Sequence, residues 1–138
     1  MADVSVTAAS VAMHAVAATT ELVTYGETIT QGEVVYRDST SSKMKLADAD
    51  LSEAAATVYG IALTPGDLDD KGYIAKAGPI DIGATLTVGE IYVLSSTAGA
   101  IAPEADLAAD DYVSIIGVAS AADQLDIDLN NTGVVVPT

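Results

Sequence analysis

Short apolar runs, separated by turn residues about every ten positions, follow one another along most of this chain. In the clearest run, residues 123–130, every second residue is apolar: Leu125, Ile127 and Leu129. This period of two is typical of a strand with one buried face. Further strands are predicted at 21–25, 34–36, 44–46, 57–63, 72–77, 85–87, 90–95, 101–102 and 112–119. Many short strands with turns between them predict an all-β fold, a small β-barrel or sandwich.

One part of this pattern occurs twice. TITQGEVVYRDST begins at Thr28, TLTVGEIYVLSST begins at Thr85, and the offset of 57 residues then continues without a gap. Two pairs of glycines keep that offset, Gly32 with Gly89 and Gly60 with Gly117. Solenoids need three or more stacked repeats, so two copies favour a single body built from two similar halves.

The repeat divides the chain into parts. We predict a body at 28–138, in which copies at 28–63 and 85–120 flank a linker at 64–84, preceded by an extended N-terminal arm at 1–27. The arm carries no acidic or basic side chain from residue 4 to residue 20 apart from His14. It lacks the features of a signal peptide and of a membrane span. It either reaches a neighbouring protein by strand addition or forms the first strand of its own body.

A glycine stands inside each of two apolar strands, Gly60 at 57–63 and Gly117 at 112–119. Glycine within a strand indicates a bulge or a close approach of another backbone. We therefore expect that valine at either position disrupts the body.

Charge limits the range of partners. The net charge is −15, and the five basic residues all precede residue 77: Arg37, Lys43, Lys45, Lys71 and Lys76. Nucleic acids and anionic membranes are recognised through clustered lysine and arginine, so neither is an expected partner.

Catalytic and metal-binding patterns are weak. Residues 67–72 begin like a calcium loop, but Lys71 occupies a ligand position and Gly78 stands where a bidentate glutamate belongs. Asp126 and Asp128 share one strand face without a nearby histidine or cysteine. The chain has no Cys, Trp or Phe, and its six tyrosines suit core or interface packing better than sugar binding. We expect no enzyme activity, no catalytic residue, no metal and no cofactor.

The order of short motifs resembles the capsid decoration, or cement, proteins of tailed bacteriophages. The resemblance covers about residues 28–133, and its most specific parts are GEIYVLSSTAGAIAP and DYVSIIGVAS. It implies a small β-rich structural protein on the outer capsid surface of a virion. Such a protein binds the major capsid protein and joins neighbouring subunits, commonly as a homotrimer.

Residues of the arm and of the basic segment are the expected contacts with the capsid or with another subunit. They are Val4, Val6, Val11, Met13, Val16, Arg37, Lys43 and Lys45. If the arm reaches out to the shell, a chain without residues 1–20 keeps a folded body and binds capsids at least tenfold more weakly. Two alternatives remain: another phage structural protein of the tail, neck or fibre base, and a glycan-binding module.

Overall fold

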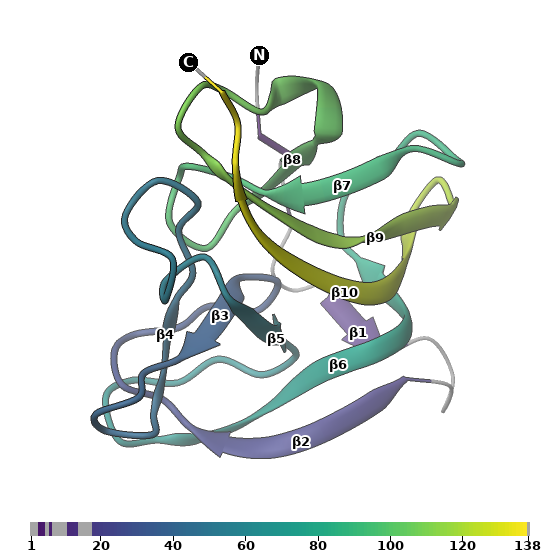
Figure 1. Ribbon diagram of the computed structural model, residues 1–138. Coiled ribbons are helices and arrows are strands. Elements are labelled where there is room, and N and C mark those ends of the chain that lie inside the picture. Colours follow the sequence, from purple (N-terminus) through teal and green to yellow (C-terminus); the bar gives the residue numbers. More distant parts are fainter. Residues whose placement is uncertain (1–2, 5, 7–10, 14–17, 138) are drawn as a thin grey trace.

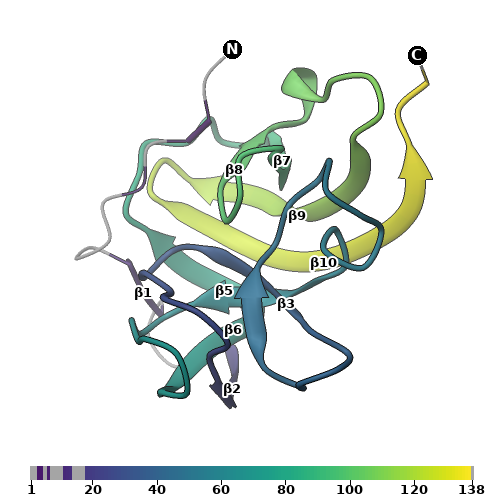
Figure 2. The ribbon, with the colours of Figure 1, turned by 90° about the vertical axis from the view of Figure 1, so that its left-hand side faces the viewer.

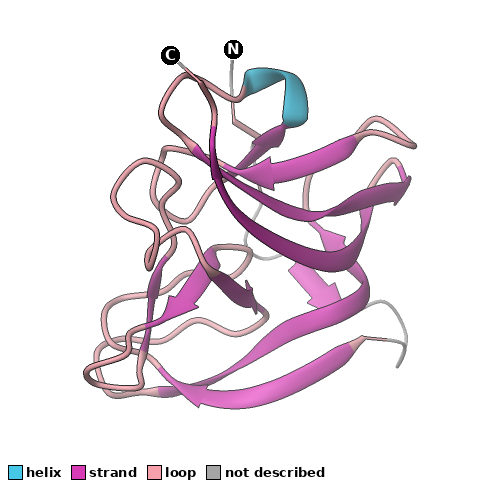
Figure 3. Cartoon of the chain, viewed as in Figure 1, coloured by secondary structure: helices cyan, strands magenta, loops and turns pink. Residues whose placement is uncertain are grey.

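The computed structural model describes residues 3–4, 6, 11–13 and 18–137. Among these residues it contains ten β-strands, one short 3-10 helix (η2, Glu104–Asp106) and no α-helix. The strands form one sheet that curls into a half barrel (Figures 1 and 3). The all-β fold predicted from the sequence is confirmed.

The strands of the two halves follow the same order from the edge of the sheet to its centre. The sheet runs β4-β3-β5-β6-β10-β9-β7-β8, so that β4-β3-β5-β6 in the first half corresponds to β8-β7-β9-β10 in the second, and β1 and β2 pair in addition with β6. The bounds are β1 Val11–Met13, β2 Thr19–Thr24, β3 Val34–Arg37, β4 Met44–Leu46, β5 Val58–Ala62, β6 Lys71–Ile82, β7 Ile91–Leu94, β8 Ile101–Pro103, β9 Tyr112–Ala121 and β10 Gln124–Val135. The first half therefore ends in β6, the second half ends in β10, and these two strands join the halves (Figure 2).

The two sequence copies have the same strand pairing. β3 pairs with β4 and β5 in the first half, and β7 pairs with β8 and β9 in the second. Tyr36 lies opposite Lys45, and the residues 57 positions later, Val93 and Ala102, also lie opposite each other. The repeated sequence thus folds with the same register in both halves.

The turn that opens each copy is duplicated as well. The backbone N–H of Gly32 donates to the carbonyl of Ala62 at 2.8 Å, and that of Gly89 donates to the carbonyl of Ala119 at 2.8 Å. The two glycines have φ angles of 87° and 86°, in the left-handed region that glycine adopts without strain. The same turn therefore leads the chain into β3 and into β7.

The predicted bulges occur in both halves. The pairing with β3 skips Tyr59, the pairing with β7 skips Ile116, and each skipped residue comes just before the strand glycine. A Cβ atom on Gly60 would lie 2.7 Å from the carbonyl oxygen of Ala75. On Gly117 it would lie 2.1 Å from the equivalent oxygen, that of Asp126. Each glycine thus lets a bulged strand pack directly against the next backbone.

The segment predicted as a linker is a central part of the sheet. β6 is 12 residues long, where the sequence predicted only a strand at 72–77, and it pairs with β1, β2, β5 and β10. Gly78, with a φ of 90°, interrupts its regular strand conformation. Proline at 79 ended the predicted strand too early, because prolines are rare inside sheets.

Two smaller predictions differ from the structure. Residues 85–87, predicted as a strand, are a loop, although Leu86 is buried and its N–H donates to the carbonyl of Ala122 at 2.5 Å. β10 continues beyond residue 130, where the predicted strand ended, because register shifts and a φ of 68° at Gly133 absorb the irregularity.

The main core lies between the two halves. It contains Ile61 and Ile80 from the first half and Ile116 and Leu125 from the second, all fully buried. A smaller second core surrounds Tyr25, whose hydroxyl donates to the carbonyl of Thr64 at 2.6 Å.

The Tyr25 ring packs directly on the backbone of two glycines, Gly66 and Gly72. A Cβ atom on Gly72 would come within 2.4 Å of the ring, and one on Gly66 within 2.7 Å. Burial raises the pKa of the Tyr25 phenol. The second core therefore fixes the end of β2 against the loop that leads into β6.

Replacing the strand glycines by alanine should destabilise the protein in a graded way. We expect Gly117→Ala to cost about 3 kcal/mol or more and Gly60→Ala somewhat less, because each new methyl meets a backbone oxygen. Gly89→Ala is the control: its Cβ would meet nothing within 4 Å, so only the positive φ costs energy, about 1 kcal/mol. Urea denaturation measures all three, and equal stability of Gly117→Ala and Gly89→Ala would contradict the close approach.

Candidate functional site

The apolar contact residues predicted in the N-terminal segment lie against the protein's own body. Val4 and Val6 are half-buried and pack on the main core, and Val11 is buried in β1 opposite Ile82. Met13 lies opposite Ile80, and Val16 lies outside the described residues. A contact between these residues and a capsid stays a prediction, but Val4, Val6 and Val11 already have an intramolecular role.

The N-terminal segment also occupies both ends of the sheet. The N–H of Val4 donates to the carbonyl of Ile101 in β8 at 2.9 Å, and the N–H of Gly26 donates to that of Met44 in β4 at 2.7 Å. Met44 and Ile101 are equivalent residues in the two copies. A carboxylate oxygen of Glu27 further accepts from the N–H of Leu46 at 2.8 Å. Val4, Gly26 and Glu27 therefore satisfy edge groups in both halves.

Val6 and Val11 cover the first of the two duplicated turns. A Cβ atom on Gly32 would lie 2.6 Å from Val6 and 2.9 Å from Val11, whereas the equivalent Gly89 has no atom of the described structure within 4 Å. The expectation that the body folds without residues 1–20 stays a prediction, but the structure shows contacts that the truncated body would lose. Such a truncation removes β1, uncovers Gly32 and shortens β2.

The predicted basic contacts gather at one end of the first half. Lys43 forms an ion pair with Asp69, and Lys45 lies 3.5 Å from a carboxylate oxygen of Asp38. Hydrogen bonding from the Ser41 hydroxyl, more than the lysine, lowers the pKa of Asp38. Each of these lysines thus has an acidic partner within the chain.

Arg37 differs from the other four basic residues. It is exposed at the end of β3, and its guanidinium makes no hydrogen bond or ion pair with the described residues. The hydrogen bond from Lys76 is the main cause that lowers the pKa of Glu21, and the nearby charge of Arg37 lowers it slightly further. Arg37 is therefore the basic side chain with its donors free for a partner.

A polar cluster beside Arg37 crosses the outer part of the first half. Lys76 of β6 lies 3.1 Å from a Glu21 oxygen in β2, and its ammonium lies 4.1 Å from the centre of the Tyr59 ring in β5. The Tyr59 hydroxyl donates to the same Glu21 carboxylate at 3.1–3.2 Å. The sequence did not predict this cluster, because its members are 17 or more residues apart and none belongs to a motif.

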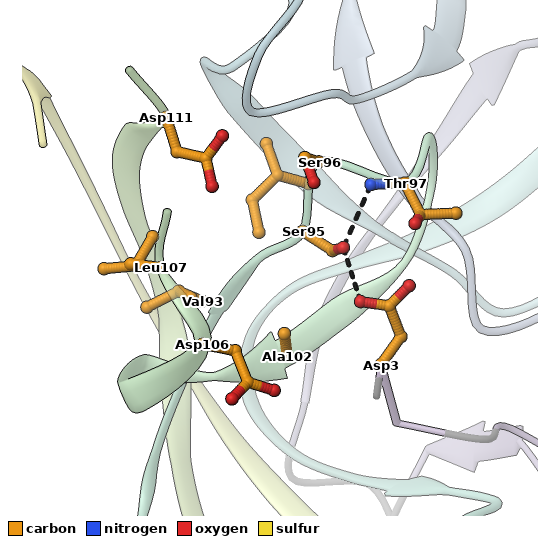
Figure 4. Close-up of a pocket in the computed structure, with 10 residues that line it drawn as sticks. Asp3, Val93, Ser95, Ser96, Thr97, Ala102, Asp106, Leu107 and Asp111 are labelled. Carbon is orange, nitrogen blue, oxygen red and sulfur yellow. Dashed lines mark hydrogen bonds between the residues drawn. The ribbon is translucent and has the colours of Figure 1, made fainter. Parts of the chain in front are cut away.

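A small cavity lies at the outer end of the second half (Figure 4). Its volume is about 140 Å³, and Asp3, Ser95, Asp106 and Asp111 contribute polar groups to its lining. The Ser95 hydroxyl donates to Asp3 at 2.5 Å and accepts from the N–H of Thr97 at 3.0 Å. The Oδ2 atom of Asp106 is buried and has no hydrogen-bond partner among the described residues.

These carboxylates do not form a metal centre. Within the described part of the chain, no group of three or more aspartate, glutamate, histidine or cysteine side chains is arranged to hold a metal ion. In residues 67–72, which begin like a calcium loop in the sequence, the carboxylate of Asp70 accepts from the N–H of Asp67 at 2.8 Å, and Asp69 forms an ion pair with Lys43. Those residues serve as a structural turn.

No family model matches the sequence, and no curated protein matches it. Among the described residues, no helix has the length and apolar character needed to cross a membrane.

The Glu21–Lys76 pair should act as a measurable electrostatic unit. The hydrogen bond from Lys76 lowers the pKa of Glu21 below its ordinary value of 4.5, and the same bond raises the pKa of Lys76 above 10.5. The pair therefore adds stability that is lost below about pH 4.5, as Glu21 gains a proton, and above about pH 10.5, as Lys76 loses one. In Lys76→Gln, we expect the pKa of Glu21, measured by NMR titration, to rise toward 4.5; an unchanged value would show that Lys76 is not its partner.

Removing the N-terminal segment should destabilise the body. We expect Val11→Ala to cost about 2 kcal/mol, since the valine side chain is almost fully buried. Deleting residues 1–20 should cost more. Exposed Val88→Ala, at 63% exposure, is the matched control and should melt like the wild type. A truncated chain with wild-type melting temperature would show that the segment does not contribute to stability.

Proposed function

We propose that this protein is a virion structural protein that binds the outer surface of an icosahedral bacteriophage capsid. In this proposal it stabilises the shell by joining neighbouring subunits of the major capsid protein. The proposal starts from the sequence resemblance to capsid decoration proteins. The observation that supports it best in the structure is that all basic residues lie in one half of the body.

All five basic residues belong to the first half, on β3, on β6 and on or next to β4. Residues 77–138 carry nine acidic residues and no basic one. A protein with this distribution has one end suited to contact with another protein and another end that repels its own copies in solution. Such an asymmetry suits a protein present in many oriented copies on one surface.

The proposed mechanism is added interface area without chemical turnover. We propose that three copies act together as a homotrimer, so that contacts of moderate strength combine into tight attachment. Each bound copy then adds contacts that an expanding shell would have to break.

The number of copies per virus particle tests this function and separates it from the alternatives. Calibrated mass spectrometry of purified particles should find hundreds of copies, in a simple ratio to the major capsid protein. A count between three and a few dozen would instead indicate a tail, neck or fibre-base protein. Absence of the chain from purified particles would contradict a virion role altogether.

A further inference from the structure

Strand β2 has a neighbour on one side only within the described part of the chain. It pairs with β6 along its whole length, and no other described strand pairs with it, although Tyr25, the next residue, forms a parallel bridge with Met44 of β4. Figures 1 and 2 both show β2 at the margin of the molecule. The outward N–H and C=O groups of such an edge strand are free to pair with a strand from another chain.

The other edge strands, β4, β8 and β1, are less suited to pair with a strand from another chain. Gly26 and Glu27 bind backbone groups of β4, and Val4 binds a backbone group of β8. β1 offers only three residues. β2 has six residues, TTELVT, without the proline or lysine that commonly protects an edge. It is therefore the edge best suited to accept another strand.

An exposed apolar pair lies along this edge. Leu22 of β2 is directly opposite Tyr73 of β6, and the two residues are 51% and 50% exposed. Neighbouring strands bring such directly opposed side chains into contact with each other. A strand that pairs with the backbone of β2 could therefore also pack its apolar side chains on Leu22 and Tyr73.

The charge around β2 indicates the chemistry of its partner. Lys71, Lys76 and Arg37 lie on or near this edge, and Lys71 donates to the Thr24 hydroxyl at 3.1 Å. Glu21 is the one acidic residue of β2. The paired residues of β2 and β6 therefore carry more basic than acidic side chains, while Asp69 and Asp70 lie beyond the end of the pair and bind the backbone of Tyr25. Acidic side chains on a partner complement this pair of strands.

A second copy of this chain is a poorer occupant. Antiparallel pairing of two β2 edges would bring the two sets of basic side chains together. The second half, which has no basic residue, could offer its edge strand β8 to β2 of another copy. The backbone N–H of Val4, however, already donates to the carbonyl of Ile101 in β8.

We propose that β2 is the docking strand of this protein, and that its occupant is an extended, acidic segment of the major capsid protein. The segment pairs with the open edge of β2, packs on Leu22 and Tyr73, and places carboxylates near Arg37 and Lys71. This inference rests on the proposed capsid-binding function and adds to it the face that meets the shell. The N-terminal valines then stabilise the body, and the capsid contact lies at β2.

Matched substitutions in the full-length chain test the docking strand. Leu22→Asp places a negative charge on the exposed apolar pair, and Val134→Asp makes the same change at a 60% exposed position in β10. We expect Leu22→Asp to weaken binding to capsids stripped of this protein at least tenfold, measured by co-sedimentation. Val134→Asp should bind within about twofold of the wild type. Thermal melting verifies that both variants are folded.

A second pair of substitutions tests the role of the Arg37 charge and leaves the β2 strand itself unchanged. Arg37→Gln and Asn130→Asp both lower the net charge by one unit, and both positions are exposed. Arg37→Gln should weaken capsid binding severalfold and reduce its dependence on salt, whereas Asn130→Asp should do neither. Equal effects of the two would mean that net charge, and not this edge, governs binding.

The outcomes separate this inference from the proposed function. If the wild-type chain does not bind capsids, the function itself is wrong. If it binds and both Leu22→Asp and Arg37→Gln bind as tightly, the function stands and β2 is not the docking strand. If Leu22→Asp dissociates an oligomer of the free chain in analytical ultracentrifugation, the occupant is a second copy and the inference is wrong.

Discussion

The pairing of β6 with β10 holds the two halves of this protein together, and most of the structure depends on it. Ile80 lies opposite Leu125 at this junction, and both side chains are completely buried in the main core. β6 also carries β5 and the N-terminal strands β1 and β2. A change that displaced β6 would therefore disturb the first half, the junction and the N-terminal segment at once.

The two halves share a backbone plan but differ in their surroundings. Val34 and Ile61 are opposite each other and fully buried in the first half, whereas the equivalent pair, Ile91 and Val118, is partly exposed in the second. The basic residues also stay in the first half. Duplication thus supplied the same turn, bulge and register twice, while the side chains came to differ. The two halves of the body therefore have the same backbone arrangement but different surfaces.

Local patterns predicted much of this fold, and long-range contacts account for what they missed. The 57-residue repeat predicted two similar halves, and Gly60 and Gly117 predicted bulges with close backbone approach. The role of β6 was missed because Gly78 and Pro79 look like the end of a strand, and only its partners keep them within the sheet. The cluster around Glu21 was missed because hydrogen bonds join residues from distant strands, which no periodicity records.

The capsid account is tested most directly by a cryo-electron-microscopy reconstruction of the virus particle from the source of this chain. The account predicts density for the curled β-body on the outside of the shell, with β2 and Arg37 facing a capsid subunit and the acidic half facing solvent. Density at the tail or neck would contradict capsid decoration. Density on the shell with the acidic half facing inward would retain decoration and contradict the proposed orientation.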